Sequence, residues 1–166
     1  AKIVSPWQVE IARNDGVAQR LTTRSIVIAA GAHPFVPPIP GIDEVVYLTS
    51  DTVWNLRQLP RRLVVLGGGP IGAELTQAFA RLGAKVTQVE MAPRILIRED
   101  PEVSDLVTQR FRAEGIDVLV NHKAKQFVAE NGAKILIAEH DGRDVRIPFD
   151  ALLVAVGRVA NMTGYG

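Results

Sequence analysis

A glycine-rich run near the middle of the chain has residue types and spacing that could hold an anion on backbone amides. Gly67, Gly69 and Gly72 stand at G-x-G-x-x-G spacing directly after the apolar run Leu63–Leu66, and a helical pattern follows. An acid, Glu90, comes 18 residues after Gly72. The three glycines would permit a tight turn, close approach of a pyrophosphate, and close packing of helix on strand. Strand, glycine spacing, helix and acid together predict a dinucleotide fingerprint, whereas the glycine motif alone would indicate only a flexible turn.

The elements around this run must position its ligand groups. Apolar residues recur on one face of the helix expected over Ile71–Leu82, and Gly83 ends it. A pyrophosphate would sit at the start of this helix, where free N–H groups and the helix dipole favour an anion. The strand expected over Lys85–Val89 is rich in β-branched residues, as buried parallel strands tend to be. Glu90 follows that strand, where its carboxylate could accept hydrogen bonds from the adenosine ribose.

Composition excludes several classes of protein. The 166 residues are 47% hydrophobic, enough for a core, and the net charge of +1 comes without a basic cluster, so nucleic acid is not an expected partner. No apolar run reaches the roughly 18 residues of a membrane span, and no leader pattern begins the chain, so we expect a cytoplasmic protein without a membrane partner. Because cysteine is absent, these residues hold no disulfide, thiolate zinc site or thiol nucleophile.

The other residues with reactive or aromatic side chains are expected to be structural. His33, His122 and His140 are scattered singly, so neither a metal site nor a catalytic triad is expected. We interpret Trp7 and Trp54 as packing residues. Ser50, Ser104 and Thr108 are interpreted as helix caps or helix-surface residues.

The chain resembles itself at a fixed offset of 126 residues. Residues 9–31 align without a gap on residues 135–157, with an Asp-Gly pair in register. Each copy predicts a strand, an Asp-Gly turn, a returning strand and a buried apolar strand, Ser25–Ala30 or Ala151–Val156, that ends in glycine. Composition alone could also produce such a match. A true repeat implies that the first copy closes a dinucleotide domain whose beginning is absent, so that the chain is a fragment.

The order of the remaining elements predicts an α/β fold. Four prolines between residues 32 and 41 predict an extended connector, and Ser50 is expected to cap a short helix that reaches Leu56. A second helix is expected over Pro101–Glu114 with Asp100 as its cap. These elements predict a Rossmann-like domain with a mostly parallel sheet and an antiparallel β-meander. Its further strands are expected over residues 116–120, 125–129, 134–140 and 143–148.

Four segments together resemble one known family. GGGPIGAE, ILIREDPEVSDLVTQRFRAEGIDV, AVGRVAN and SIVIAAGAHPFVPPIPG are similar to segments of the flavin-dependent pyridine nucleotide-disulfide oxidoreductases, and IREDPEV looks most like the mercuric-reductase-like members. The likeness covers nearly the whole chain, although Ala160 replaces a proline usual in this family. It implies a nicotinamide-nucleotide domain inserted into an FAD domain. Residues 1–60 would then be the end of the FAD domain with its connector, and residues 61–158 would be the NAD(P) domain. Residues 159–166 would begin the return to the FAD domain.

The resemblance also implies roles for individual residues. Glu90 would bind the ribose diol and favour NAD(H) over NADP(H), because a carboxylate would repel a 2′-phosphate. Arg94, with Arg98, could instead serve a 2′-phosphate or be a solvated loop charge. Glu74 would lie near the nicotinamide ring, or be an exposed first-turn acid favoured by the helix dipole. Gly157 would lie at the nucleotide edge of the last strand, and Ala30 and Gly31 would lie in the segment near the flavin. The phosphate loop would be formed by Gly67, Gly69, Pro70, Ile71 and Gly72.

The resemblance implies a flavoenzyme in which NAD(P)H passes hydride to FAD, and the flavin reduces a disulfide, a metal ion or another acceptor. The parent would be a homodimer that needs the rest of its FAD and dimerisation domains. Its redox cysteine pair and flavin glycine loop would lie upstream and its catalytic base downstream, so we expect no catalytic residue here and no activity from this chain alone. The alternatives are a non-catalytic NAD(H)-binding sensor, and an NADH oxidase or ferredoxin-type reductase of the same architecture.

Overall fold

The computed structural model describes residues 1–166, and the chain folds into two compact units. The smaller unit comprises residues 1–33 and 159–166, and the larger comprises residues 34–158. Where the chain passes from one unit to the other, β4 (Ala32–Pro34) and β13 (Arg158–Ala160) form a two-stranded sheet.

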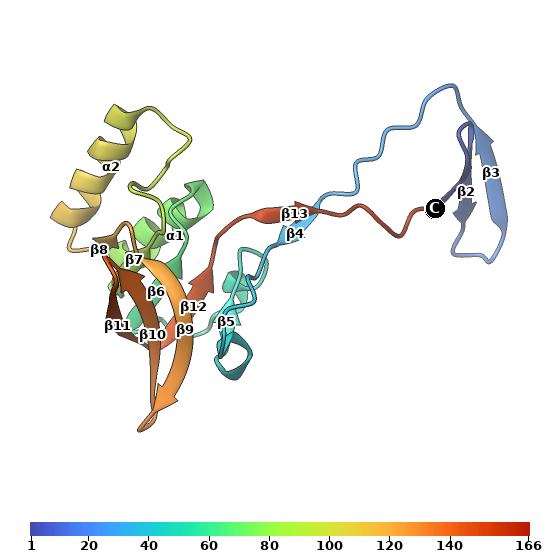
Figure 1. The fold of residues 1–166 in the computed structure, drawn as a ribbon. Coiled ribbons are helices and arrows are strands. Elements are labelled where there is room, and N and C mark those ends of the chain that lie inside the picture. The colour runs from blue at the N-terminus through green and yellow to red at the C-terminus, as the bar shows by residue number, and fades with distance from the viewer. The chain divides into compact units, whose positions relative to one another are not determined.

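A five-stranded parallel sheet forms the centre of the larger unit (Figure 1). All four pairs of neighbouring strands are parallel, which confirms the predicted α/β fold. The sequence did not predict the first strand, a two-residue segment at the sheet edge. The strands lie in the order β5 (Tyr47–Leu48), β12 (Ala151–Val154), β6 (Arg62–Leu66), β7 (Lys85–Val89) and β8 (Asp117–Leu119).

Two helices make the crossovers between β6, β7 and β8. α1 (Pro70–Arg81) and α2 (Pro101–Ala113) both begin with proline at a position where a missing N–H has no cost. Asp100 is at the N-cap of α2 as expected, but its side chain makes no capping hydrogen bond. Neither helix, at 12 and 13 residues, is long and apolar enough to cross a membrane.

An antiparallel meander of three strands, β9 (Lys123–Glu130), β10 (Ala133–His140) and β11 (Arg143–Phe149), packs on the other face of the parallel sheet (Figure 1). The predicted meander is confirmed. The side chains of β6 alternate between two cores, and the strand reads as a continuous apolar run because both faces are buried. Its helix side holds Leu63 and Val65, and its meander side holds Val64 and Leu66.

The segment before β6 belongs to the larger unit and carries three buried apolar residues, Ile42, Val45 and Val53. It contains two single turns of 3-10 helix, η1 (Ile42–Glu44) and η2 (Val53–Asn55). The predicted helix from Ser50 to Leu56 is therefore wrong in type and extent. Backbone N–H groups here bond threonine side chains: the N–H of Thr49 donates to Thr52 Oγ1 at 2.9 Å. Such bonds compete with helix formation.

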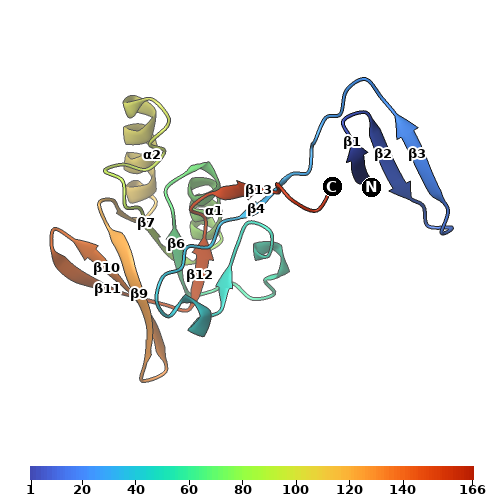
Figure 2. The same cartoon turned by 45° about the vertical axis from the view of Figure 1, so that its right-hand side comes forward.

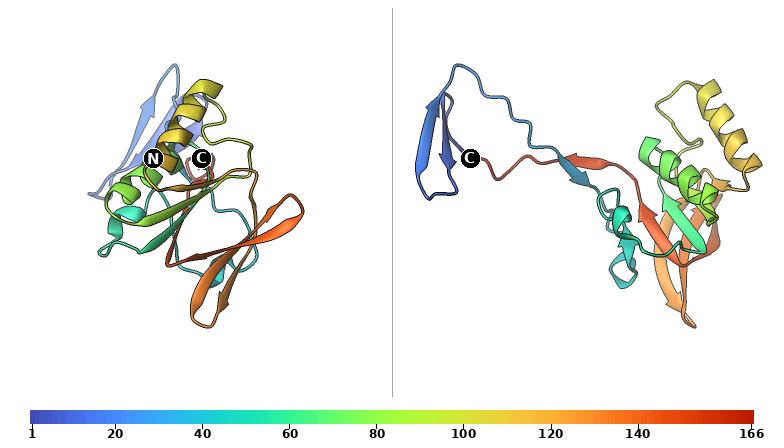
Figure 3. Two further views of the ribbon diagram at one scale, coloured as in Figure 1. Left: turned by 90° about the vertical axis from the view of Figure 1, so that its left-hand side faces the viewer. Right: turned by 180° about the vertical axis from the view of Figure 1, so that it is seen from behind.

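The smaller unit contains a second three-stranded meander, β1 (Lys2–Ser5), β2 (Gln8–Ala12) and β3 (Ala18–Thr22) (Figure 2). The expected buried strand Ser25–Ala30 is not observed: these residues form no strand, and Val27 is 87% exposed. Figure 3 shows this stretch as a bare extended trace after β3. No strand of this structure is hydrogen-bonded to it, so its backbone joins no ladder.

The two tryptophans are not packing residues, contrary to expectation. Trp7 is 58% exposed and Trp54 is 70% exposed. Trp54 Nε1 donates to the carbonyl of Ser50 at 2.7 Å, so its ring is fixed by a polar contact rather than by a core.

Candidate dinucleotide-binding site

The turn between β6 and α1 can be built only with glycine at two of the predicted positions. Gly67 has φ +115°, and a Cβ there would lie 2.4 Å from the carbonyl oxygen of Ala155. A Cβ on Gly72 would lie 2.3 Å from the carbonyl oxygen of Gly67. Both distances are far inside contact range, so any side chain at either position would push the backbone of the turn apart. Gly67 forms the predicted tight turn, and Gly72 allows the start of α1 to lie against that turn.

The start of α1 presents unpaired amides. Pro70 has no N–H, and the N–H groups of Gly69, Ile71 and Gly72 have no hydrogen-bond partner in the chain. A Cβ built on Gly69 would meet no atom within 4 Å, so the space beside its backbone is open. Together with the positive end of the helix dipole, these donors form a site for an anionic group.

The carboxylate of Glu90 is held at the end of β7 by two backbone amides. Its Oε2 accepts from the N–H of Gly68 at 2.6 Å, and its Oε1 accepts from the N–H of Ala92 at 2.7 Å. Each oxygen keeps a further lone pair for a ligand hydroxyl. The acid predicted for the ribose is therefore fixed beside the glycine loop before any ligand arrives.

Gly68 is a site residue that sequence reasoning missed. A Cβ on it would lie 2.9 Å from both Cγ and Oε2 of Glu90 and 3.0 Å from Ile95 Cγ2. The fingerprint leaves this position variable, so only the unusual run of three glycines could have indicated it. Glycine here allows the carboxylate to contact the loop.

The loop after Glu90 packs against the glycine turn. The N–H of Leu96, a residue with φ +51°, donates to the carbonyl of Gly68 at 2.6 Å. Ile95 is fully buried, and its carbonyl accepts from Ser104 Oγ at 2.6 Å. Ser104 is therefore a buried residue that fastens α2 to this loop, not the helix-surface or capping residue expected from sequence. Arg94 lies in the same loop, where its Nη2 donates to the carbonyl of Ile97 at 3.1 Å.

The other predicted cofactor residues do not all join this site. Glu74 is exposed and lies beyond the first turn of α1, so the interpretation as a first-turn acid is wrong. Gly157 follows the last core strand, with φ +136° and open space at its Cβ position. Ala30 and Gly31 belong to the smaller unit, where their carbonyls accept from the side-chain and backbone N–H groups of Asn161, respectively.

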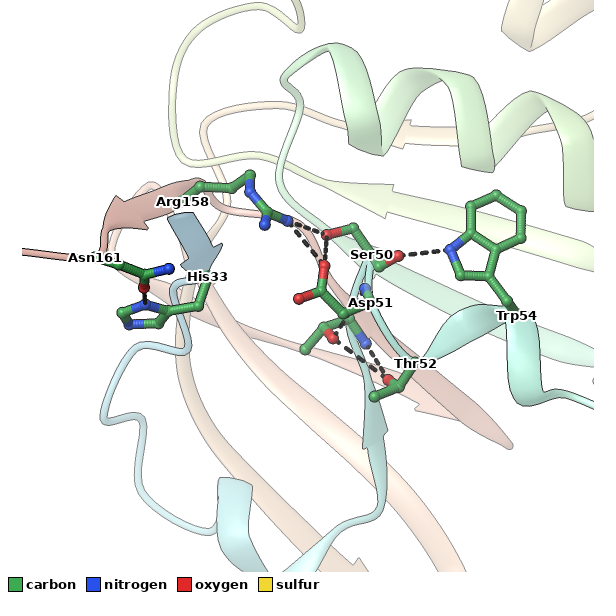
Figure 4. Close-up of polar contacts among 8 residues, drawn as sticks. His33, Ser50, Asp51, Thr52, Trp54, Arg158 and Asn161 are labelled. Atoms are coloured by element: carbon green, nitrogen blue, oxygen red, sulfur yellow. Dashed lines mark hydrogen bonds and ion pairs between the residues drawn. The ribbon is translucent and has the colours of Figure 1, made fainter. Parts of the chain in front are cut away.

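A polar cluster that the sequence did not reveal joins two residues just after β5 to Arg158, the first residue of β13 (Figure 4). Arg158 Nη1 lies 2.9 Å from both Ser50 Oγ and Asp51 Oδ1. Ser50 thus contacts an arginine instead of capping a helix. The carboxyl ends of parallel strands share one edge of a sheet, so this cluster is on the same edge as the glycine turn. Arg158 stands beside Gly157 in the AVGRVAN segment, which was the one available indication.

Two of the three histidines are paired rather than scattered singly. The rings of His122 and His140 stack with centroids 4.1 Å apart and planes 7° from parallel. His122 Nδ1 lies 2.6 Å from the carbonyl oxygen of Val120, and His140 Nδ1 lies 3.0 Å from that of Asn121. No group of three or more metal-ligating side chains is present. The stack therefore fastens the meander to the end of β8.

One strongly shifted carboxyl group joins the two helices. Glu114 Oε1 lies 2.8 Å from Arg81 Nη2 and 2.7 Å from Arg110 Nε, and Gln77 also donates to this carboxylate. Hydrogen bonds from Arg81, the largest cause, and from Gln77 and Arg110 lower the pKa of Glu114 to about 2, against the opposing effect of desolvation. This cluster stabilises the contact of α1 with α2 and contains none of the predicted cofactor residues.

Comparison with known proteins agrees with this geometry. The family model described as pyridine nucleotide-disulphide oxidoreductase matches residues 1–165. The chain belongs to this family. Mercuric reductases from Staphylococcus aureus and Streptomyces lividans are each 40% identical to it, over 86% and 95% of the chain. The HOCl-induced flavoprotein disulfide reductase from Escherichia coli has a similar structure, with a TM-score of 0.79 at 31% identity over 98% of the chain and 36% of that protein.

The resemblance found in the sequence is thus confirmed at the level of the family. The chain spans only 26% and 33% of the length of the two mercuric reductases, so it corresponds to one portion of such proteins.

Proposed function

We propose that the chain is the NAD(H)-binding portion of an FAD-dependent pyridine nucleotide-disulfide oxidoreductase, in which hydride passes from the nicotinamide to the flavin. The observation that carries this proposal is the fixed arrangement of the glycine turn and Glu90 at one edge of the parallel sheet. The unpaired amides of Gly69, Ile71 and Gly72 would bind the pyrophosphate, and Glu90 would bind the adenosine ribose.

The strand order supports one direction for the proposed cofactor. β7, which carries the ribose acid, lies on one side of β6, and β12 lies on the other. The strand order reverses at this point, because β7 and β8 follow β6 on one side and the later strand β12 lies on the other; open α/β sheets bind ligands at such a point. With adenosine over β7, the nicotinamide half extends toward β12, the side where Gly157 follows the strand. Glu74 is an exposed residue of α1, and we assign it the family role near the nicotinamide ring.

The electrostatics of the ribose site favour NAD(H) over NADP(H). Glu90 is held within the site by two amides, and its negative charge would repel a 2′-phosphate. Arg94 already donates to the carbonyl of Ile97, which turns one of its N–H groups away from a ligand. If NADPH bound more tightly than NADH, the 2′-phosphate role for Arg94 would replace this proposal.

The rest of the parent protein would supply the flavin and the electron acceptor. When bound, FAD accepts the hydride, and the residues of this chain contribute only binding and orientation of the nicotinamide. Ala30 and Gly31 are assigned to the flavin side, and the unpaired stretch Ser25–Ala30 would gain strand neighbours from the same domain. The parent would be a cytoplasmic homodimer, and a C-x-x-x-x-C pair in its sequence would identify a disulfide or metal ion as acceptor.

NMR titration of the chain with NADH and NADPH tests the proposal, because it measures millimolar as well as micromolar dissociation constants. We expect weak NADH binding and still weaker NADPH binding. Glu90→Gln should weaken NADH binding about tenfold and narrow the difference between the cofactors, whereas Glu99→Gln, in the neighbouring loop, should leave both unchanged. Absence of NADH binding at several millimolar would contradict the proposal, and micromolar affinity would favour the self-sufficient sensor.

A further inference from the structure

A glutamine lies where the core would favour an apolar residue. Gln88 is fully buried in β7, on the face that packs against the helices and also carries Val86. Its Nε2 donates to the carbonyl of Gly67 at 3.0 Å. Its Oε1 is buried and has no hydrogen-bond partner. An unpaired buried acceptor destabilises the fold, so stability alone does not account for this residue.

The contact lies at the turn that presents the free amides. The peptide group that joins Gly67 to Gly68 is held at both ends: its carbonyl accepts from Gln88, and its N–H donates to Glu90 at 2.6 Å. The next peptide group is fixed through its carbonyl, which accepts from the N–H of Leu96 at 2.6 Å. Because the carbonyl and N–H of a trans peptide point in opposite directions, this bond turns the N–H of Gly69 away from Leu96.

Loss of the amide of Gln88 would leave the Gly67 carbonyl unpaired under the start of α1. That oxygen lies against Gly72, since a Cβ on Gly72 would come within 2.3 Å of it. An uncompensated carbonyl dipole here would oppose an anion at the helix start, and the first peptide group of the turn would lose one of its two anchors. The expected effect falls on ligand binding rather than on the fold.

We propose that Gln88 is a positioning residue of the dinucleotide site, which sets the orientation of the glycine turn through the Gly67 carbonyl. This inference rests on the proposed binding of NAD(H) at Gly67–Glu90. It goes further in assigning a binding role to a core residue that cannot touch the ligand. The unpaired Oε1 destabilises the fold, and the role of the amide in orienting the turn accounts for a glutamine at this position.

The test is a comparison of Gln88→Leu with Thr76→Val in the full 166-residue chain. Thr76 is also fully buried, and its Oγ1 is the other buried side-chain oxygen without a partner, but its hydroxyl makes no hydrogen bond to the glycine turn. For both variants the urea unfolding midpoint, the NADH dissociation constant by NMR titration and the exchange rate of the Gly68 amide are measured. Gln88→Met, close to glutamine in volume and equally free of donors, replaces Gln88→Leu if leucine does not fold.

We expect Gln88→Leu to keep its unfolding midpoint while NADH binds about tenfold more weakly and the Gly68 amide exchanges faster. Thr76→Val should change neither binding nor Gly68 exchange. An unchanged dissociation constant for Gln88→Leu, or a loss of affinity that only parallels a loss of stability, would overturn the proposal. If the unmodified chain bound no NADH, the proposed function would fail by itself, and unchanged Gly68 exchange in Gln88→Leu would then still decide against positioning.

Discussion

The two segments that align at an offset of 126 residues fold alike locally but differ in their surroundings. Residues 9–22 and 135–149 both form antiparallel hairpins within three-stranded meanders. The second meander packs its apolar face on the parallel sheet, where Phe127, Leu136 and Phe149 are buried. The first meander has no buried residue in its three strands. Hairpin formation therefore depends on local sequence, whereas a core depends on what the hairpin packs against.

The apolar strand that follows each hairpin shows the larger difference. Val27 and Leu153 occupy equivalent positions 126 residues apart, yet Val27 is 87% exposed and Leu153 is fully buried. β12 has β5 on one side and β6 on the other, while no strand is hydrogen-bonded to residues 25–30. A similarly apolar segment is thus a central strand in one unit and an unpaired segment in the other. Strand propensity takes effect only with a partner.

The largest expected effect is on the buried copy of this strand. Leu153→Ala should lower the free energy of unfolding by about 2–5 kcal/mol, because it leaves a cavity between the sheet and the helices. Val27→Ala, its matched control, should change the same quantity by less than about 0.5 kcal/mol. Urea unfolding followed by circular dichroism at 222 nm reports the larger unit, which contains both α-helices. Similar losses in the two variants would show that the copies share one environment.

A smaller effect is expected at the two Asp-Gly turns. Gly142 has φ +74° and Gly16 has φ +81°, and a Cβ at either would meet no atom within 4 Å, so alanine introduces only backbone strain. Gly142→Ala should destabilise the larger unit by about 1 kcal/mol. Gly16→Ala should leave the transition at 222 nm unchanged, because its hairpin supports no helix. An equal shift from both variants would contradict the expectation that only the second hairpin supports the core of the larger unit.

The smallest expected effect, and the one most sensitive to pH, concerns the ion pairs of Glu114 with Arg81 and Arg110 in the larger unit. Because the pKa of Glu114 falls from 4.5 to about 2 on folding, its stabilisation is fully present above pH 4.5 and is lost as the pH falls toward 2. Glu114→Gln should therefore be less stable than the unmodified chain at pH 7, with a difference that vanishes near pH 2.

The matched control for these ion pairs is the exposed pair of Glu10 with Arg20 in the first meander. Glu10→Gln should not shift the unfolding transition at 222 nm at either pH, because exposed pairs contribute little. A difference between Glu114→Gln and the unmodified chain that stayed constant from pH 7 to pH 2 would contradict the account of Glu114.

Sequence predicted the features that depend on spacing along the chain. β7 has the expected bounds, α1 differs from its prediction by one residue at each end, and Glu90 stands beside the glycine turn as expected. Long-range contacts were not predictable in this way. Burial of Ser104 and the stack of His122 on His140 join segments that no periodicity connects. The role of Gly68 likewise depends on where the Glu90 side chain lies.

The central claim is that Gly67–Glu90 binds NAD(H), and an amide-resolved NMR titration of the chain with NADH tests it most directly. We expect saturable shifts of the Gly69, Ile71 and Gly72 amides and of the amides beside Glu90, with no shift at the first Asp-Gly turn. Shifts centred elsewhere in the chain, or none at several millimolar NADH, would contradict the account.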